Sequence, residues 1–203
     1  MTSIIVSYWP SRRKYLDGII EPMKKLGEVI VWNNWNEPIE GAINSNENHH
    51  SRVRYIASIL SKDDILYFQD DDIFVTEQTI KDMTNHPGIS NGAIVGLFGK
   101  KITSSSLPYT TAQEVNEGEA DIILGRAFAM NKHTLMRLLP SLFLRKDIRQ
   151  EDDIITSLEN VKQGFKNYVV NSSGWHGVDE EREGYFYQPE HMERRNNACK
   201  LYV

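Results

Sequence analysis

The fold of this chain is decided around residues 65–72, ILYFQDDD, where a short apolar run passes through Gln69 into three consecutive aspartates. The apolar run predicts a buried strand, so the aspartates lie at its carboxyl end. In open α/β sheets, ligands bind at the carboxyl ends of the strands. Carboxylate oxygens suit Mg²⁺ and Mn²⁺, which keep open positions that the phosphates of a substrate can fill. The stretch therefore predicts a divalent-cation site and a phosphorylated ligand.

The three aspartates by themselves are also compatible with a solvated loop, because runs of like charge usually face water. Adjacent carboxylates repel one another, and a cation is the simplest compensation where the site is only partly solvated. At the level of these residues, both interpretations stay open.

Short apolar runs alternate with helical stripes on the amino-terminal side of this stretch. Residues 4–6 and 29–32 predict strands, and apolar residues recur at helical spacing over 15–26 and 53–60. This order of strand, helix and strand predicts βαβ units. We therefore expect an α/β fold with a central, mostly parallel sheet flanked by helices.

The second half of the chain is less regular. We expect a helix that Thr76 caps, a helix that Pro140 ends, and a long polar connection over residues 99–119. Loops of that length are usually functional or mobile. Further strands are predicted at 93–97, 122–124, 127–130 and 168–170, and a helix at 154–161.

Composition narrows the classes of protein. The 203 residues, 40% of them hydrophobic, can bury one sizeable core, so we expect a single domain over 1–203. A net charge of -5 argues against nucleic acid as the main partner. A lone cysteine, Cys199, excludes a disulfide framework and a cysteine-based zinc site. No apolar stretch reaches the ~20 residues of a membrane span, and the first residues lack a signal-peptide pattern. We expect a soluble, cytoplasmic protein.

A second acidic cluster, Glu151-Asp152-Asp153, opens the helix predicted at 154–161. The helix dipole stabilises carboxylates in a first turn, and this capping role accounts for at least one of them. A carboxylate that faces the cation across a cleft would instead orient or deprotonate an acceptor hydroxyl, or stabilise positive charge at a sugar carbon. The spacing leaves capping and catalysis open.

Several segments occur in an order shared with a known enzyme family. They are residues 29–34 (VIVWNN), Arg52 with Arg54, 70–72, 94–96 (IVG), 125–128 (GRAF) and 152–154 (DDI). With this set, the chain resembles exostosin-like glycosyltransferases (glycosyltransferase family 64-like) of the GT-A fold, and most of all the compact glycosyltransferase domains encoded by chlorella viruses. The similarity runs from Ile4 to about Leu201. It implies a nucleotide-binding half over about 1–98 and an acceptor-side half over about 99–203.

The resemblance implies a site for Mn²⁺, or Mg²⁺, at the aspartate triplet. Asp72 would bind the ion directly, and Asp70 would lie near the ion and the ribose of the donor. Asp71 would help through the metal or a water. Apart from the resemblance, His176 is a candidate for a further metal ligand, because His is the commonest metal-ligating side chain. A lone histidine is more often structural, and Trp175-His176-Gly177 is also compatible with an aromatic core and a turn.

The resemblance also implies which residues bind the donor. They are Ser7, Tyr8, Trp9, Arg12, Arg52, Arg54, Asp70, Asp71 and His191. Arginine suits this role because its planar fork matches phosphate oxygens. The chain departs from the family at His49 and His50, where the family has Asn and Arg, and this weakens any inference about base recognition.

The implied catalytic groups are Asp153, its neighbour Asp152, and Arg195. A guanidinium beside the departing diphosphate stabilises charge that grows in the transition state. On sequence alone, Arg194 and Arg195 are equally typical of surface charges in a polar tail, because Lys and Arg are mostly exposed.

Taken together, the resemblance implies an enzyme that transfers a hexose-type sugar from a UDP-sugar to a glycan acceptor with retention of configuration. Both a covalent intermediate and front-face transfer remain open. If the protein is viral it would work in the host cytoplasm, and it could be part of a larger polypeptide. Two other classes also stay open. One is a nucleotidyltransferase, although residues 7–10 (SYWP) stand where such enzymes usually have a glycine-rich basic loop. The other is a non-catalytic sugar- or nucleotide-binding module.

Overall fold

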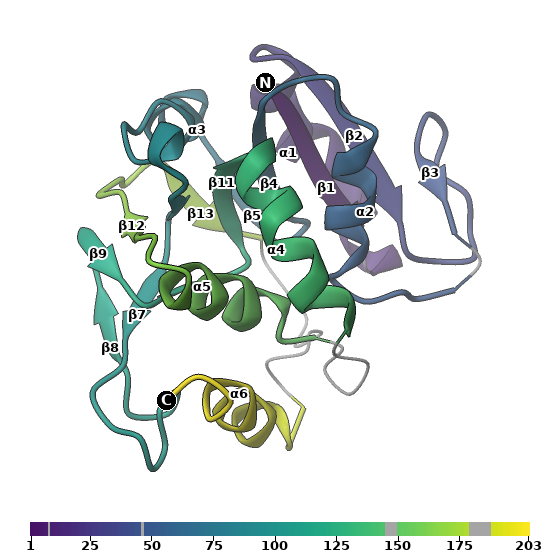
Figure 1. The fold of residues 1–203 in the computed structure, drawn as a ribbon. Helices are drawn as coiled ribbons and strands as arrows, with labels where there is room; N and C mark the ends of the chain where they lie inside the picture. Colours follow the sequence, from purple (N-terminus) through teal and green to yellow (C-terminus); the bar gives the residue numbers. More distant parts are fainter. Residues whose placement is uncertain (8, 46, 145–149, 179–187) are drawn as a thin grey trace.

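The computed structural model describes residues 1–7, 9–45, 47–144, 150–178 and 188–203. A large sheet occupies its centre (Figure 1). The strands of this sheet are β1 (Thr2–Ser7), β2 (Glu28–Asn33), β3 (Ile43–Asn44), β4 (Ile65–Asp70), β6 (Ile94–Gly96), β9 (Gly118–Ala120), β11 (Ala127–Asn131) and β12 (Asn167–Val169). Their order across the sheet is β3-β2-β1-β4-β11-β6-β12-β9, and all run in one direction except β11 and β9. The expected α/β fold with a mostly parallel central sheet is confirmed.

The remaining strands form two small antiparallel sheets. They are β5 (Ile73–Val75), β7 (Gly99–Lys101), β8 (Gln113–Val115), β10 (Ile122–Ile123) and β13 (Trp175–Gly177). One sheet has the order β10-β7-β8, and the other pairs β13 with β5. The expectation of a plain polar connection over 99–119 is therefore wrong, because β7, β8 and β9 lie in it. These strands are too short and too exposed to produce an alternating apolar pattern.

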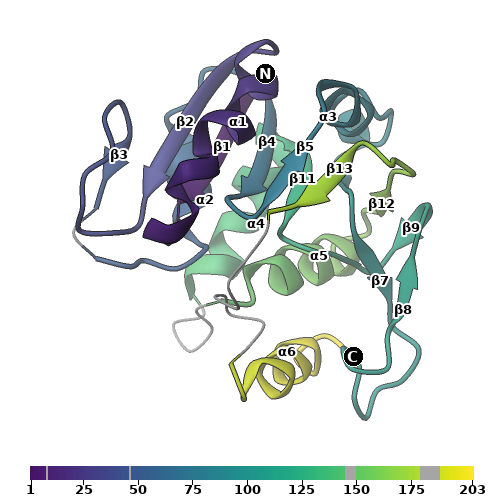
Figure 2. The same ribbon diagram turned by 180° about the vertical axis from the view of Figure 1, so that it is seen from behind.

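Helices cover both faces of the central sheet (Figures 1 and 2). The helices are α1 (Arg13–Lys24), α2 (Val53–Ile59), α3 (Glu77–Thr84), α4 (Lys132–Leu144), α5 (Asp152–Lys162) and α6 (His191–Cys199), with 3-10 turns η1 (Pro10–Arg12) and η2 (Ile89–Asn91). One face carries α2, α4 and α5, the other carries α1 and α3, and α6 packs beside α5. Within the part of the chain that the structure describes, no helix is both long and apolar enough to cross a membrane.

Neighbouring residues of the central strands point into two separate cores. Ile4 of β1 and Phe68 of β4 pack under α2, α4 and α5, whereas Ile5 and Tyr67 pack under α1 and α3. The Phe68 ring stacks on Phe128 of β11 with centroids 4.8 Å apart. A one-residue slip would exchange the two sets of side chains, so burial on both faces fixes the register. This register determines which residues emerge at the carboxyl ends of β1 and β4.

Two predicted helix boundaries had different outcomes. Thr76 caps α3 as expected, because its hydroxyl accepts a hydrogen bond from the Thr79 N–H at 3.3 Å. The prediction that Pro140 ends a helix is wrong, since α4 continues beyond it. Leu138 and Leu142, on either side of the proline, are both fully buried. Burying such side chains contributes about 1.5–3 kcal/mol each, which offsets a cost of ~3 kcal/mol for proline inside a helix.

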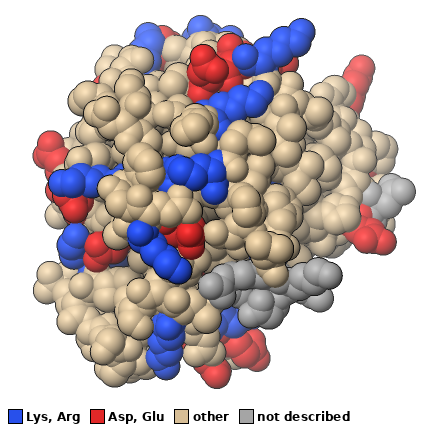
Figure 3. Space-filling model, viewed as in Figure 1, with Lys and Arg blue, Asp and Glu red and all other residues tan. Residues whose placement is uncertain are grey.

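Charged side chains of both signs are mixed on the surface. On the face shown in Figure 3, Lys and Arg are interspersed with Asp and Glu rather than gathered in one patch. Proteins that track a nucleic-acid backbone carry a continuous basic stripe instead. The expectation that nucleic acid is not the main partner stays a prediction.

Candidate active site

The aspartate triplet lies where β4 ends, as the sequence predicted. β4 is parallel to β1, and their register places Asp70 beside Val6, one residue before β1 ends at Ser7. The chain then passes through Asp71 and Asp72 into β5. The triplet and the end of β1 thus share the carboxyl edge of the parallel strands, where α/β sheets bind their ligands.

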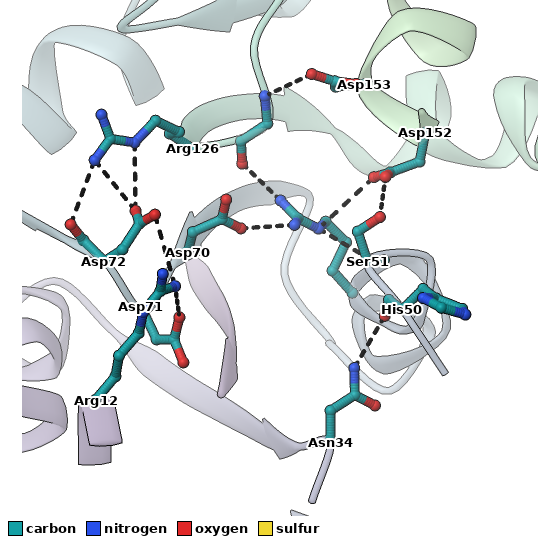
Figure 4. Close-up of polar contacts among 12 residues, drawn as sticks. Arg12, Asn34, His50, Ser51, Asp70, Asp71, Asp72, Arg126, Asp152 and Asp153 are labelled. Carbon is teal, nitrogen blue, oxygen red and sulfur yellow. Dashed lines mark hydrogen bonds and ion pairs between the residues drawn. The ribbon is translucent and has the colours of Figure 1, made fainter. Parts of the chain in front are cut away.

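Arginine side chains surround the second and third aspartates (Figure 4). Arg12, in the turn after β1, donates from Nη1 to Asp71 Oδ1 at 2.9 Å, and the same nitrogen lies 3.6 Å from Asp72 Oδ2. Arg126, just before β11, donates from Nε and Nη2 to Asp72 Oδ1, both at 3.3 Å. The Arg12 side chain is 7% exposed and that of Arg126 is 37% exposed. Arg12 is therefore held inside the protein, whereas Arg126 reaches solvent.

Arg54 of α2 links the first aspartate to the second acidic cluster. Its Nη2 donates to Asp70 Oδ1 at 2.6 Å, and its Nε lies 3.8 Å from Asp152 Oδ2. Further bonds run to the Gly125 carbonyl at 2.6 Å and the Ser51 carbonyl at 3.1 Å. The structure thus brings together Asp70 and Asp152, which the sequence separates widely.

Negative charge is crowded at Asp70. The pKa of Asp70 is raised to about 7, mainly by burial; the Arg54 guanidinium opposes this rise, and the carboxylates of Asp72, Asp71 and Asp152 add to it. Such crowding favours either a proton or a cation at the site.

The donor atoms at this edge fit a hard divalent cation. The side chains of Asp70 and Asp72 keep 21% and 20% of their surface exposed, and both offer only oxygen. In the described ranges, no three His, Cys, Asp or Glu side chains form a cluster that could hold a metal ion. Two carboxylates without a complete cage are the donor set of an ion that also binds substrate phosphates, as Mg²⁺ commonly does.

His176 lies on β13, opposite Phe74 of β5. Its exposed imidazole stacks on the Phe74 ring, with centroids 4.7 Å apart. The residue that follows this strand contacts the triplet through its backbone, because the Val178 N–H donates to the Asp72 carbonyl at 3.0 Å. The ring contact supports the structural role, and a metal-binding role for His176 stays a prediction.

Asp152 is buried in the first turn of α5 and points toward α2. Its Oδ1 accepts a hydrogen bond from the Ser51 hydroxyl. Burial raises the pKa of Asp152; the Arg54 guanidinium lowers it, the Asp153 carboxylate raises it, and the hydrogen bond from Ser51 lowers it. These contacts lead away from the helix terminus, so capping does not account for this carboxylate.

Asp153 forms a buried ion pair with Arg195 of α6. Arg195 Nη2 donates to Asp153 Oδ2 at 2.7 Å, and each side chain is 8% exposed. The Gly125 N–H donates to the same oxygen at 3.1 Å. Burial by itself would lower the pKa of Arg195, but the Asp153 carboxylate reverses this and raises it. The guanidinium also packs over the Tyr109 ring at 4.2 Å. The alternative that Arg195 is a surface charge in a polar tail is therefore wrong.

His191 begins α6 and is half-buried. Burial lowers the pKa of His191 to about 4; Arg195 and Arg194 lower it too, and Asp153 opposes them. The imidazole is therefore neutral at pH 7, and it can hydrogen-bond to a ligand without adding charge.

The other residues assigned to donor binding lie around the end of β1 and the start of α2. Ser7 is buried, and Trp9 is half-buried with its ring 6.3 Å from that of Trp35. Arg52 is half-buried at the N-cap of α2. Tyr8 lies outside the described residues.

Comparison with known proteins identifies the fold of the chain. No family model and no curated protein matches the chain. Among solved structures, the crystal structure of GalNAc-T7 with UDP, GalNAc and Mn²⁺ matches with a TM-score of 0.66 and 9% sequence identity. The chain has a GT-A glycosyltransferase fold. The match covers 99% of this chain but 48% of the GalNAc-T7 chain, so this chain spans about half the length of that protein.

Arg126 contacts the aspartate triplet, although the sequence assigned it no role. It belongs to the segment 125–128 that supported the family resemblance, and the strand predicted there began after it, at Ala127. β11 runs antiparallel to β4, so the residue that precedes β11 lies beside the residues that follow β4. The Asp70 N–H accordingly donates to the Arg126 carbonyl at 2.9 Å. The position of Arg126 beside Asp72 could be predicted only if the direction of β11 in the sheet were known, and the sequence does not give that direction.

A second feature missed by the sequence is the loop that leads into α2. His50 has a φ of 60°, in the left-handed region that residues other than glycine rarely occupy. Asn34 holds this loop, since its Oδ1 accepts from the His49 N–H and its Nδ2 donates to the His50 carbonyl, both at 3.1 Å. Strained backbone of this kind gathers at functional sites. The loop fixes Ser51 and Arg54 beside the second acidic cluster.

Proposed function

We propose that this protein is a metal-dependent glycosyltransferase that moves a hexose-type sugar from a UDP-sugar to a glycan acceptor with retention of configuration. The observation that carries the proposal is the arrangement at the end of β4, where Arg54 joins Asp70 to Asp152. The GT-A fold supports it, as does the structure of GalNAc-T7, solved with UDP, GalNAc and Mn²⁺.

We assign Asp72 and Asp70 as the residues that hold Mn²⁺ or Mg²⁺. The ion would neutralise the diphosphate and stabilise the negative charge that grows on it as the sugar leaves. Asp71 is turned to Arg12 and keeps the loop between β4 and β5 in place. Arg126 has a solvent-accessible guanidinium next to Asp72. When the donor binds, this guanidinium can replace its hydrogen bond to the Asp72 carboxylate with one to a phosphate oxygen.

The donor nucleoside would lie at the end of β1. Ser7, Tyr8 and Trp9 follow one another there, and Trp9 offers an aromatic face for a base or ribose. Arg52 at the start of α2 and His191 at the start of α6 flank the site as polar donors to the diphosphate.

Asp153 is the carboxylate that we assign to the reacting sugar. Arg195 and the Gly125 N–H both donate to Oδ2, which fixes the direction of the carboxylate. Asp152 is a positioning residue, because its contacts run to Ser51 and Arg54 and through Arg54 to the triplet. This arrangement is compatible with a covalent intermediate on a carboxylate and with front-face transfer, in which the leaving phosphate takes the proton of the acceptor.

Calorimetry with UDP tests the proposal. We expect saturable UDP binding in the presence of Mn²⁺ and none after chelation, with GDP as the matched nucleotide control. UDP binding with the same affinity in the presence and absence of Mn²⁺, or no UDP binding at all, would contradict the proposal.

A screen of UDP-sugars separates the remaining classes of protein. A glycosyltransferase slowly hydrolyses its own donor and releases UDP. A nucleotidyltransferase releases pyrophosphate from a nucleoside triphosphate instead, and a non-catalytic module binds its ligand without turnover.

A further inference from the structure

A cavity of about 420 Å³ lies between β7–β8 and the segment that leads into β13. Its volume lies within the range of small-molecule sites. Two aromatic rings and a set of polar side chains face it, including Phe98, Trp175, Glu114, Asn116 and Asn171. None of the residues assigned to donor binding, metal binding or catalysis lines it.

The aromatic wall of this cavity is formed by Trp175 and Phe98. Their rings meet edge to face, with centroids 4.7 Å apart and an angle of 82° between the planes. Trp175 is 37% exposed, so part of the indole is available to a ligand. A pyranose ring has an apolar face of C–H groups, which an exposed indole can cover.

The polar wall keeps unused hydrogen-bonding capacity. Within the described part of the chain, the side chains of Glu114 and Asn116 make no hydrogen bond or ion pair, whereas the Asn171 amide donates to Glu117 at 3.3 Å. A carboxylate and a free amide offer acceptors and donors to vicinal hydroxyl groups. The combination of an aromatic face with such groups matches a sugar ring better than it matches a flat, purely apolar ligand.

The negative charge of Glu114 in the cavity lining distinguishes neutral from acidic sugars. The cavity is lined by Glu114 and by no Lys, Arg or His among the described residues. A carboxylated or sulfated sugar would bring a like charge toward Glu114 without a basic partner, which is unfavourable. The lining therefore favours a neutral sugar over an acidic one.

The cavity is held in a fixed relation to the aspartate triplet. Arg126, which donates to Asp72, packs over the Phe98 ring at 5.5 Å. The segment before Trp175 is anchored to α3, because the Thr76 N–H donates to the Gly174 carbonyl at 2.8 Å. Arg126 therefore contacts both the aspartate triplet and the aromatic wall of the cavity.

We propose that this cavity binds a neutral hexopyranose ring of the glycan acceptor. The proposal rests on the proposed glycosyltransferase function and adds the class of acceptor and the residues that select it. Trp175 stacks on the ring, Asn116 and Glu114 bond its hydroxyl groups, and Glu114 excludes acidic sugars.

The direct test is a titration of ¹⁵N-labelled protein with methyl β-glucopyranoside, methyl β-galactopyranoside and methyl β-glucuronide, each without donor. The chain has four tryptophans, and Trp175→Phe assigns the indole N–H signal of Trp175. We expect a saturable shift of that signal with at least one neutral glycoside, and affinity for the glucuronide about tenfold or more weaker because of like charge at Glu114. No saturable shift, or tighter binding of the glucuronide, overturns the proposal.

Variants separate the polar and aromatic contributions. Trp175→Ala and Asn116→Ala should abolish or weaken glycoside binding, and Glu114→Gln should reduce the preference for neutral sugars. Leu60→Ala, at the exposed C-cap of α2, is the matched control and should bind as the wild type does. Trp175→Phe keeps an aromatic ring and should retain part of the affinity, which distinguishes a lost contact from a lost fold.

Calorimetry with UDP and Mn²⁺ on the same samples keeps the two proposals apart. Intact UDP binding without glycoside binding overturns the acceptor pocket alone. Glycoside binding without UDP binding overturns the glycosyltransferase function, and with it the acceptor role. If Trp175→Ala weakens binding of a UDP-sugar but not of UDP, the cavity holds the sugar of the donor, and the acceptor assignment is wrong.

Discussion

Two regions of the structure differ in how their polar side chains are paired. The first, the aspartate edge, comprises Asp70, Asp71 and Asp72 with Asp152 and Asp153, and the second is the cavity lined by Trp175 (the Trp175 cavity). At the aspartate edge each carboxylate faces a guanidinium, as Asp70 faces Arg54 and Asp153 faces Arg195. In the cavity, the side chains of Glu114 and Asn116 make no hydrogen bond within the described residues. Charges that are already positioned stabilise a transition state without reorganisation, whereas open groups beside an aromatic ring leave hydrogen bonds for a neutral ligand. The difference matches the proposed division into a charged donor side and a neutral acceptor side.

The largest expected effect separates catalysis from binding at the charged edge. Asp153→Asn should lower sugar transfer by about 10³-fold, the usual scale for a lost acid or base group. UDP binding with Mn²⁺ should persist, because Asp153 does not belong to the metal pair. Steady-state assays beside calorimetry measure both. Glu159→Gln, a carboxylate change on the same helix, is the control, and equal loss of binding and transfer in Asp153→Asn would contradict the assignment.

The next effect concerns stability. Arg54→Met leaves Asp70 and Asp152 without their shared guanidinium, so we expect the free energy of unfolding to fall by about 3 kcal/mol. Denaturant titration measures this change. Lys166→Ala breaks an exposed ion pair with Glu119 and should leave stability unchanged. If both variants lost similar free energy of unfolding, the buried contacts of Arg54 with Asp70 and Asp152 would contribute no more to stability than an exposed ion pair does.

Asp72→Ala tests the metal assignment. Removing one of two carboxylate ligands should weaken Mn²⁺-dependent UDP binding by about 100-fold, a few kcal/mol of lost charge stabilisation. Titration of UDP at fixed Mn²⁺ measures the loss. Asp82→Ala, an exposed carboxylate on α3, should have no effect. Unchanged UDP affinity in Asp72→Ala would show that the metal does not bind at the triplet.

The pH dependence of stability reports the crowding at Asp70. Its pKa is raised to about 7 in the folded protein, so the folded state holds a proton that the unfolded chain releases near pH 4. The stabilisation from this group is complete below pH 4 and is lost as the pH rises toward 7. His191, whose pKa is lowered to about 4, acts in the opposite direction.

Asp70→Asn isolates this contribution, since His191 is common to both proteins. We expect the difference in unfolding free energy between the wild type and Asp70→Asn to change between pH 4 and pH 7, with the wild type losing stability relative to the variant. Chemical denaturation across that range measures it, and a flat difference curve would show that Asp70 is not perturbed.

The smallest expected effect lies at the junction of the two regions. Arg126 contacts both Asp72 and the Phe98 ring, and it is partly exposed. Arg126→Gln removes a cation that competes for Asp72, so we expect Mn²⁺ affinity without nucleotide to rise by about threefold, the scale of an exposed ion pair. Electron paramagnetic resonance of free Mn²⁺ measures this. A weaker affinity would show that Arg126 supports the metal site rather than opposing it.

Features that depend on local sequence were predictable. The apolar run before Asp70 specified β4 and the edge at which the triplet lies, and Thr76 capped α3 as expected. Pro140 shows where local rules fail, since the buried leucines on both sides of it keep α4 helical. The strands within 99–119 were missed because short exposed strands carry no apolar period.

The sequence by itself determined the α/β order, the end of β4 and the acidic chemistry of the site, because apolar runs and charges act where they stand in the chain. Only the tertiary structure decided which arginine meets which aspartate. Arg126 reaches Asp72 because β11 is antiparallel to β4, and Arg195 reaches Asp153 because α6 packs on α5. The Trp175 cavity likewise exists only where β13 and the β7–β8 pair come together. Such contacts depend on strand direction and long-range packing, and no local pattern in the chain encodes them.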